Sequence, residues 1–141
     1  MKTKKMIYRV ASTAMCLTML GAGAQVFAAT SDEYVGYSSN GSLSAKVTCK
    51  IDGNDSFFTG VDYCEAWTTV TPGGIAAGTG LAIFNEREQV INERTLTYQQ
   101  SEMYIKLSAY DRSSAASAIS VHNINDDTYG SFTHMLGCTF L

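Results

Sequence analysis

The chain has 141 residues, with 10 lysines and arginines against 13 aspartates and glutamates, so its formal net charge is −3. This length allows one domain with one hydrophobic core and excludes a large multidomain architecture. The composition shows no internal repeat and no low-complexity tract, which excludes repeat and solenoid architectures.

Residues 1–28 have the three parts of a secretory signal peptide. The N-terminal region carries four cations and no acid: Lys2, Lys4, Lys5 and Arg9. An apolar stretch follows at 10–27, and Val26 and Ala28 occupy the two small-residue positions of a signal peptidase site, which predicts cleavage after Ala28. The alternative is a retained membrane anchor, but glycines and a glutamine interrupt the stretch. We expect residues 29–141 to be a single secreted β domain without a membrane anchor.

Removal of the signal peptide changes both the charge and the cysteine count. Six cations and 13 acids remain, which is a net charge of −7. An acidic surface repels phosphate backbones, so nucleic acid is not an expected partner. Loss of Cys16 leaves three cysteines, and an exported protein meets conditions in which disulfides form.

The first half of the mature chain predicts two strands. Residues 30–40 are polar and are expected to fray at their start. Apolar and polar residues alternate completely over 42–51, which is typical of a half-buried antiparallel strand. Residues 61–71, rich in Thr, Tyr and Trp, predict a second strand. It is closed by Thr-Pro-Gly-Gly at 71–74, where Pro followed by Gly favours a type II turn.

The second half predicts two hairpins and one further strand. Residues 80–85 and 90–98 flank a polar turn at 86–89 and predict a hairpin, with a helix over 84–94 as the alternative. Residues 102–110 alternate again, and residues 115–123 and 130–141 predict a second hairpin. About seven strands joined by short turns predict an all-β fold, an antiparallel β-sandwich or a small barrel.

The three remaining cysteines are Cys49, Cys64 and Cys138. If the strands at 42–51 and 61–70 pair with Cys49 opposite Cys64, every inward residue meets an inward residue. Opposed cysteines in a non-hydrogen-bonded pair lie near disulfide distance, which favours a Cys49–Cys64 bond. The alternative is a bridge from either residue to Cys138, which would close a longer loop. In the favoured pairing Cys138 is a buried free thiol or links two chains.

The same register predicts an outer face that carries aromatic and cationic side chains. Six residues make up the candidate binding set: Lys46, Lys50, Tyr63, Trp67, Tyr104 and Tyr110. Lys46 would oppose Trp67 and Lys50 would oppose Tyr63, while the other two tyrosines extend this face or lie on the opposite sheet. Such pairs either only stabilise a solvated sheet or form a platform for a sugar ring or a protein partner.

The two histidines, His122 and His134, lie on the last two predicted strands. A turn centred on Thr128 would place them opposite each other, whereas a turn centred one and a half residues earlier would pair Val121 with Phe132. The second register matches apolar residues with apolar residues better. Two histidines without a third ligand make a weak site, so no metal is expected and both are interpreted as surface or boundary residues.

Motifs that carry chemistry are lacking in the sequence. Acidic turns at 52–55 and 125–127 do not match a calcium loop and are interpreted as turn formers. No hydrolase, zinc-protease or phosphate-loop pattern occurs, so no catalytic residue and no cofactor are predicted. The sequence thus favours a secreted, non-enzymatic domain that binds a cell surface, a glycan or a protein. The alternatives are an antagonistic or antimicrobial effector and, less favoured, a small secreted hydrolase.

Overall fold

The computed structural model describes residues 31–52, 62–109 and 115–140. These residues form eight strands: β1 (Ser31–Tyr37), β2 (Ser44–Asp52), β3 (Asp62–Thr71), β4 (Ala77–Asn85), β5 (Val90–Gln100), β6 (Glu102–Ala109), β7 (Ala115–Asp126) and β8 (Gly130–Thr139). Among them there is no helix, and hence none long and apolar enough to cross a membrane.

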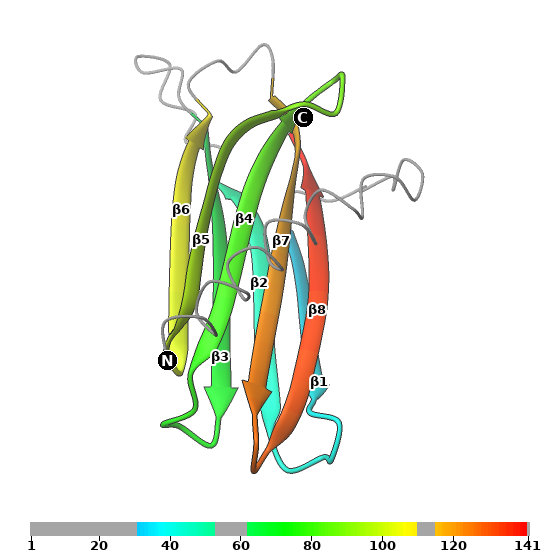
Figure 1. Ribbon diagram of the computed structural model, residues 1–141. Helices are drawn as coiled ribbons and strands as arrows, with labels where there is room; N and C mark the ends of the chain where they lie inside the picture. The colour runs from blue at the N-terminus through cyan, green and yellow to red at the C-terminus, as the bar shows by residue number, and fades with distance from the viewer. Residues whose placement is uncertain (1–30, 53–61, 110–114, 141) are drawn as a thin grey trace.

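The strands form two antiparallel sheets of four strands that pack face to face (Figure 1). Sheet A has the order β1-β2-β3-β6, and sheet B has the order β5-β4-β7-β8. The chain changes sheet after β3, after β5 and after β6. This architecture confirms the predicted antiparallel β-sandwich, with eight strands in place of about seven.

The core lies between the sheets and takes one face of each strand. Strand β6 shows the expected alternation, with Met103, Ile105 and Leu107 buried between exposed neighbours. Strand β4 lies inside sheet B and is buried along nearly its whole length. The inward residues of both sheets pack into one contiguous cluster, because a sheet removes one apolar face from water when a second sheet covers it.

Strand β1 is the element that the sequence did not predict. It pairs with β2 from Ser31 opposite Lys50 to Tyr37 opposite Ser44, and only Gly36 among its residues is buried. An edge strand of this kind has no apolar inner row, so its sequence carries no alternation signal.

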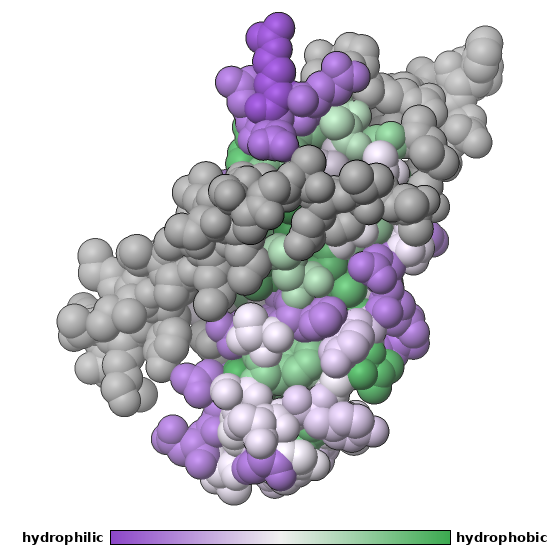
Figure 2. Space-filling view, turned by 90° about the vertical axis from the view of Figure 1, so that its right-hand side faces the viewer, coloured by the Kyte–Doolittle hydropathy of each residue, from purple (hydrophilic) through white to green (hydrophobic). Residues whose placement is uncertain are grey.

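β1 and β8 meet along one side of the sandwich. The ring of Tyr34 stacks on the ring of His134 with centroids 3.8 Å apart, which joins sheet A to sheet B at their edges. Figure 2, which faces the β8 side of Figure 1, shows hydrophilic side chains gathered at the upper end and apolar patches among paler residues below. Tyr34 and Val35 both expose apolar surface at this edge.

The segment between β4 and β5 is a hairpin turn, so the alternative of a helix over 84–94 is wrong. Phe84 lies opposite Val90, and the side-chain oxygen of Asn85 accepts hydrogen bonds from the backbone of Arg87 and Gln89. These bonds take the place of the helical pattern that the Glu and Arg residues favour, because an Asn side chain competes for backbone donors.

The predicted type II turn over 71–74 after β3 is wrong. A type II turn over 71–74 needs a positive φ at Gly73, but the positive φ is at Gly74 (+87°). The Thr71–Pro72 peptide is cis. Strand β3 still ends at Thr71, as predicted.

The predicted register of β2 and β3 is wrong, although the predicted inward faces of both strands are right. Cys49 lies opposite Ala66 and Ile51 lies opposite Cys64, a shift of two residues. A two-residue shift keeps every inward residue inward, so the apolar pattern alone does not distinguish the two registers.

Of the two registers considered for the β7–β8 hairpin, the structure has the one that places His122 opposite His134. The turn chemistry decides this register. Asp126 Oδ1 accepts hydrogen bonds from the backbone of Thr128 and Tyr129, and Gly130 follows with a φ of +82°. These contacts outweigh the better apolar match of the other register.

Candidate functional site

The outer face of sheet A carries an aromatic pair. Along β3, Tyr63, Glu65 and Trp67 alternate with inward residues and therefore point away from the core. Trp67 lies opposite Tyr104 on β6, and their ring centroids are 5.0 Å apart with planes inclined at 34°. Trp67 is half-buried and Tyr104 is 43% exposed. The two rings thus present one continuous aromatic surface to solvent.

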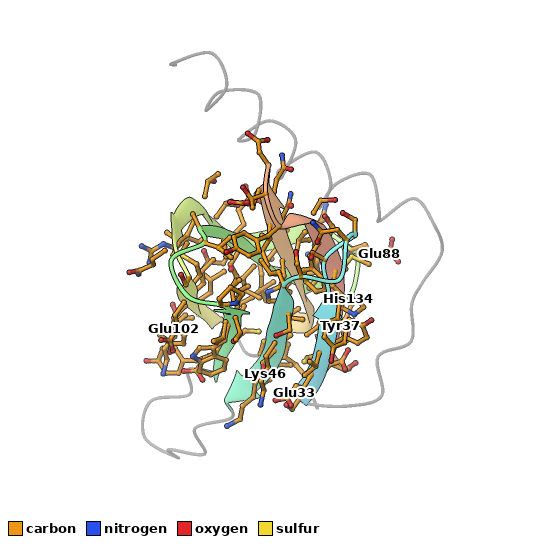
Figure 3. The ribbon with its side chains drawn as sticks, turned by 90° about the horizontal axis from the view of Figure 1, so that it is seen from below. Glu33, Tyr37, Lys46, Glu88, Glu102 and His134 are labelled. Atoms are coloured by element: carbon orange, nitrogen blue, oxygen red, sulfur yellow. The ribbon has the colours of Figure 1, made fainter. Side chains whose placement is uncertain are left out.

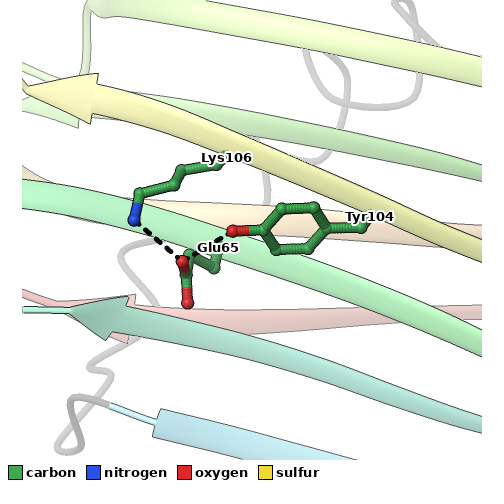
Figure 4. Close-up of polar contacts among 3 residues, drawn as sticks. All are labelled: Glu65, Tyr104 and Lys106. Atoms are coloured by element: carbon green, nitrogen blue, oxygen red, sulfur yellow. Dashed lines mark hydrogen bonds and ion pairs between the residues drawn. The ribbon is translucent and has the colours of Figure 1, made fainter.

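Glu65 of β3 lies beside this pair, opposite Lys106 of β6. The hydroxyl of Tyr104 donates to Glu65 Oε1 at 2.7 Å, and the ammonium of Lys106 is 3.2 Å from the same oxygen (Figure 4). Glu65 is only 7% exposed, so these two partners compensate for the hydration that its carboxylate loses. Lys106 also lies 4.3 Å from the ring centre of Tyr63, a cation–π contact.

We call these five residues the aromatic face: Tyr63, Glu65, Trp67, Tyr104 and Lys106. Tyr63, Trp67 and Tyr104 belong to the predicted binding set, and Tyr104 extends the β3 surface because β6 is the neighbour of β3 in sheet A. Glu65 and Lys106 were not among the candidate binding residues. Alternation already placed both on outer faces, but only the strand order brings them together.

The two predicted lysine contacts are wrong because of the two-residue register shift. Lys46 lies opposite Thr69 in place of Trp67, and it forms an ion pair of 3.0 Å with Glu33 on β1 (Figure 3). Lys50 lies opposite Glu65 in place of Tyr63. Tyr110, the last of the candidate residues, is outside the described residues.

The sandwich interior contains a buried polar cluster around His122. The hydroxyl of Thr68 is 2.7 Å from Nδ1 of this ring, and the hydroxyl of Ser120 is 2.7 Å from Nε2. Thr79 extends the cluster through a 2.6 Å bond between its hydroxyl and that of Thr68. His122 has no exposed surface, so its interpretation as a surface or boundary residue is wrong. It lies on the inward face of β7 together with Ser120. Because both residues are polar, the alternation of apolar and polar residues does not mark this face as buried.

The charge state of His122 follows from these surroundings. Burial, together with the charge of His134, lowers the pKa of His122 from 6.5 to about 3, so the ring is neutral at neutral pH. A neutral imidazole donates from one nitrogen and accepts at the other, and hydroxyl groups can do either. The hydroxyl partners of both ring nitrogens are therefore satisfied without a charge.

The pairing of Ser120 with His122 has the spacing of a nucleophile and a general base. Both residues have no exposed surface, so no substrate reaches them. The group on the far nitrogen is the hydroxyl of Thr68 and not the carboxylate that stabilises an imidazolium in hydrolases. The cluster is thus suited to holding the two sheets in register, and it offers no reactive group to solvent.

The three cysteines of the described chain are all buried and all free, so the Cys49–Cys64 disulfide expected from the sequence is not formed. The cause is again the register, since Cys49 faces Ala66 across the strands and Cys64 faces Ile51. In contrast, the thiol of Cys138 on β8 donates to the backbone oxygen of Cys49 on β2 at 3.1 Å. This thiol contact runs between the two sheets.

Metal-binding groupings of three or more His, Cys, Asp or Glu side chains do not occur within residues 31–52, 62–109 and 115–140. In the acidic turn at 125–127, Asp126 uses its carboxylate to hold the turn, as expected of a turn former. Most of the other acidic turn, at 52–55, is outside the described residues.

No protein-family model matches this chain, and no curated protein matches it significantly. The fold and the site alone therefore define its class, an antiparallel β-sandwich with an aromatic face on one outer sheet surface.

Proposed function

We propose that the mature chain is a secreted, non-enzymatic binding domain that holds its partner on the aromatic face of sheet A. The observation that carries this proposal is the half-exposed Trp67–Tyr104 pair, set beside an anchored carboxylate. Aromatic rings that combine an apolar face with a polar edge are enriched at binding surfaces.

The chemistry of the face indicates the kind of partner. Trp67 and Tyr104 offer ring faces for a sugar ring or for a flat apolar side chain. Lys106 and Glu65 supply a cation and an acceptor a few ångströms away. The bond from Tyr104 to Glu65 fixes the angle of its ring, which lowers the entropy lost when a partner stacks on it. A cell-surface glycan or a protein that presents a ring both fit this arrangement.

A non-enzymatic role is supported by the place of the reactive groups. The Ser–His pair is sealed inside the sandwich, and the outer face carries no nucleophile paired with a base among its described residues. Export is supported by the signal peptide features at residues 1–28. N-terminal sequencing of the protein recovered from the culture medium is expected to begin at Ala29, and recovery of the intact N-terminus in the cell fraction would contradict export.

A glycan array with the processed protein tests the binding role. Wild type is expected to bind a defined set of glycans, and Trp67→Ala is expected to lose at least tenfold in affinity. The matched control is Tyr37→Ala, because Tyr37 is a 70% exposed aromatic at the edge of the same sheet face, away from the pair. It is expected to bind like wild type.

If the array shows no glycan, the protein version is tested by crosslinking on intact target cells with the same two variants. Loss of crosslinking in Trp67→Ala but not in Tyr37→Ala supports a protein partner on this face. Equal behaviour of the two variants in both assays overturns the proposal.

A further inference from the structure

Cys49 and Cys138 stand at a place where the two sheets approach closely. Cys49 belongs to β2 in sheet A, and Cys138 belongs to β8 in sheet B. Packed sheets usually lie about 10 Å apart, but β2 and β8 have Cα atoms within 8 Å of each other. Small neighbours permit this approach, since Cys49 lies opposite Ala66 and Cys138 opposite Ala118.

The contact between the two residues is short and specific. The thiol of Cys138 donates to the backbone oxygen of Cys49 at 3.1 Å. Cys64 stands on the other side of Cys49, offset by two residues on the neighbouring strand. Diagonal neighbours of this kind have Cα atoms about 7–8 Å apart, beyond the usual disulfide range of about 4.4–6.8 Å.

We propose that the exported chain carries an inter-sheet disulfide between Cys49 and Cys138, with Cys64 as a buried free thiol. The described structure is then the dithiol form, in which the Cys138 thiol already contacts the backbone of Cys49. The bond would join residues 89 positions apart and tie β8 to the second strand of the other sheet. This inference rests on the proposed export but not on the proposed binding role.

The chemistry needs an oxidant of the disulfide class, such as a disulfide oxidase or oxidised glutathione. The thiolate of one cysteine attacks the oxidant disulfide, which forms a mixed disulfide and releases one thiol of the oxidant. The second thiolate then displaces the oxidant, which leaves as its second thiol. Two electrons pass to the oxidant, and the two cysteine protons are transferred with them.

The surroundings indicate when the bond forms. A hydrogen bond with Cys49 and burial raise the pKa of Cys138 well above its usual value. The hydrogen bond with Cys138 lowers the pKa of Cys49, but the bond with Cys64 and burial outweigh it and raise that pKa too. Because the thiolate is the reactive form, the folded dithiol exchanges slowly, and we expect oxidation before the sheets close.

Trypsin separates the three cysteines, which allows a direct test. Cleavage after Lys46, Lys50, Arg87 and Arg112 places Cys49 in residues 47–50, Cys64 in 51–87 and Cys138 in 113–141. The mature chain is unfolded, reduced and refolded with oxidised and reduced glutathione, and its free thiols are alkylated in denaturant before digestion. Mass spectrometry is expected to find 47–50 joined to 113–141 and 51–87 alkylated.

Any other linkage, or three alkylated peptides, overturns the proposal. Cys64→Ala supplies a matched variant that is expected to keep the bond, so the test holds even where Cys138→Ala fails to fold. Reduction is expected to lower the Tm of wild type and of Cys64→Ala by about 10–15 °C. The Tm of Cys138→Ala should not respond to reductant, and an equal response would also contradict the bond. N-terminal sequencing reports export separately, since this refolding does not depend on it.

Discussion

The aromatic face and the buried polar cluster both depend on β3, and they differ in what reaches them. Glu65 and Trp67 point from this strand toward solvent, whereas Thr68 points into the core and bonds to His122. Each cluster contains short hydrogen bonds, but only the outer one has half-exposed rings beside them. Short polar contacts alone therefore do not identify a functional site in this protein; access by solvent separates the site from the scaffold.

The largest effect that we expect is the dependence of stability on pH, which tests the buried polar cluster. His122 has a pKa of about 3 in the folded state and about 6.5 when unfolded, so between these values the unfolded chain binds more protons. Stability should fall as the pH drops below about 6.5, and this residue accounts for about 4 kcal/mol by pH 3. Urea unfolding at a series of pH values measures the loss.

The comparison variant for the pH series is His122→Gln, which has no proton to gain. Its stability at neutral pH is expected to be lower than that of wild type. Between pH 7 and pH 3 its stability should fall by about 4 kcal/mol less than that of wild type, which is the contribution of His122. If the two curves stay parallel from pH 7 to pH 3, the buried ring is not the titrating group.

A second test compares two neighbouring threonines. Thr68→Val removes the hydroxyl that joins His122 to Thr79 and leaves buried polar groups without a partner, so we expect a loss of about 2–3 kcal/mol. Thr69→Val, one residue along and exposed, should change stability by less than about 0.5 kcal/mol. Chemical denaturation of both variants gives the difference, and equal losses would contradict the contrast between the two faces.

Tyr104→Phe tests the anchoring of the outer face. It keeps the ring beside Trp67 but removes the bond to Glu65, so stability should fall by about 1 kcal/mol or less. Partner affinity should fall as well, because the ring is no longer held at its angle. Isothermal calorimetry with the partner found above measures this, and an unchanged affinity would mean that the hydroxyl does not position the ring for binding.

The smallest expected effect lies in a turn that belongs to neither cluster. Glu88 has a φ of 60°, a left-handed conformation that disfavours side chains, so Glu88→Gly should raise stability by about 0.5–1 kcal/mol. The same change at Glu86, two residues earlier in the turn and without a positive φ, should give no gain. Thermal unfolding compares them, and neither variant should alter binding.

The faces of the strands could be predicted from the two-residue alternation of apolar and polar residues in the sequence. The inward and outward residues of β2, β3 and β6 could be predicted because the alternation of apolar and polar residues assigns the faces directly. Trp67 stays on the outer face when the register shifts by two residues. The pairs across strands could not be predicted in the same way. A shift of two residues preserves every face, which is why Lys46 meets Glu33 and not Trp67.

Other failures have different physical causes. The contact between Tyr104 and Glu65 depends on β6 lying beside β3, and the order of strands in a sheet leaves no trace in local sequence. The β7–β8 register was set by the side chain of Asp126 and by Gly130, a turn preference that opposed the apolar match. His122 was missed because its partners are hydroxyl residues dispersed over three strands.

The chain passes from sheet A to sheet B, back to sheet A and again to sheet B, and this order affects how it folds. Sheet A lacks β6 until the chain has already passed through sheet B and returned, and sheet B lacks β7 and β8 until the last part of the chain is available. Most contacts in the described part of the chain therefore join residues far apart in sequence, and such topologies fold slowly, in milliseconds to seconds. An emerging chain has no early half that can complete itself, so the domain should fold as one cooperative unit only after β8 has left the ribosome or the export channel.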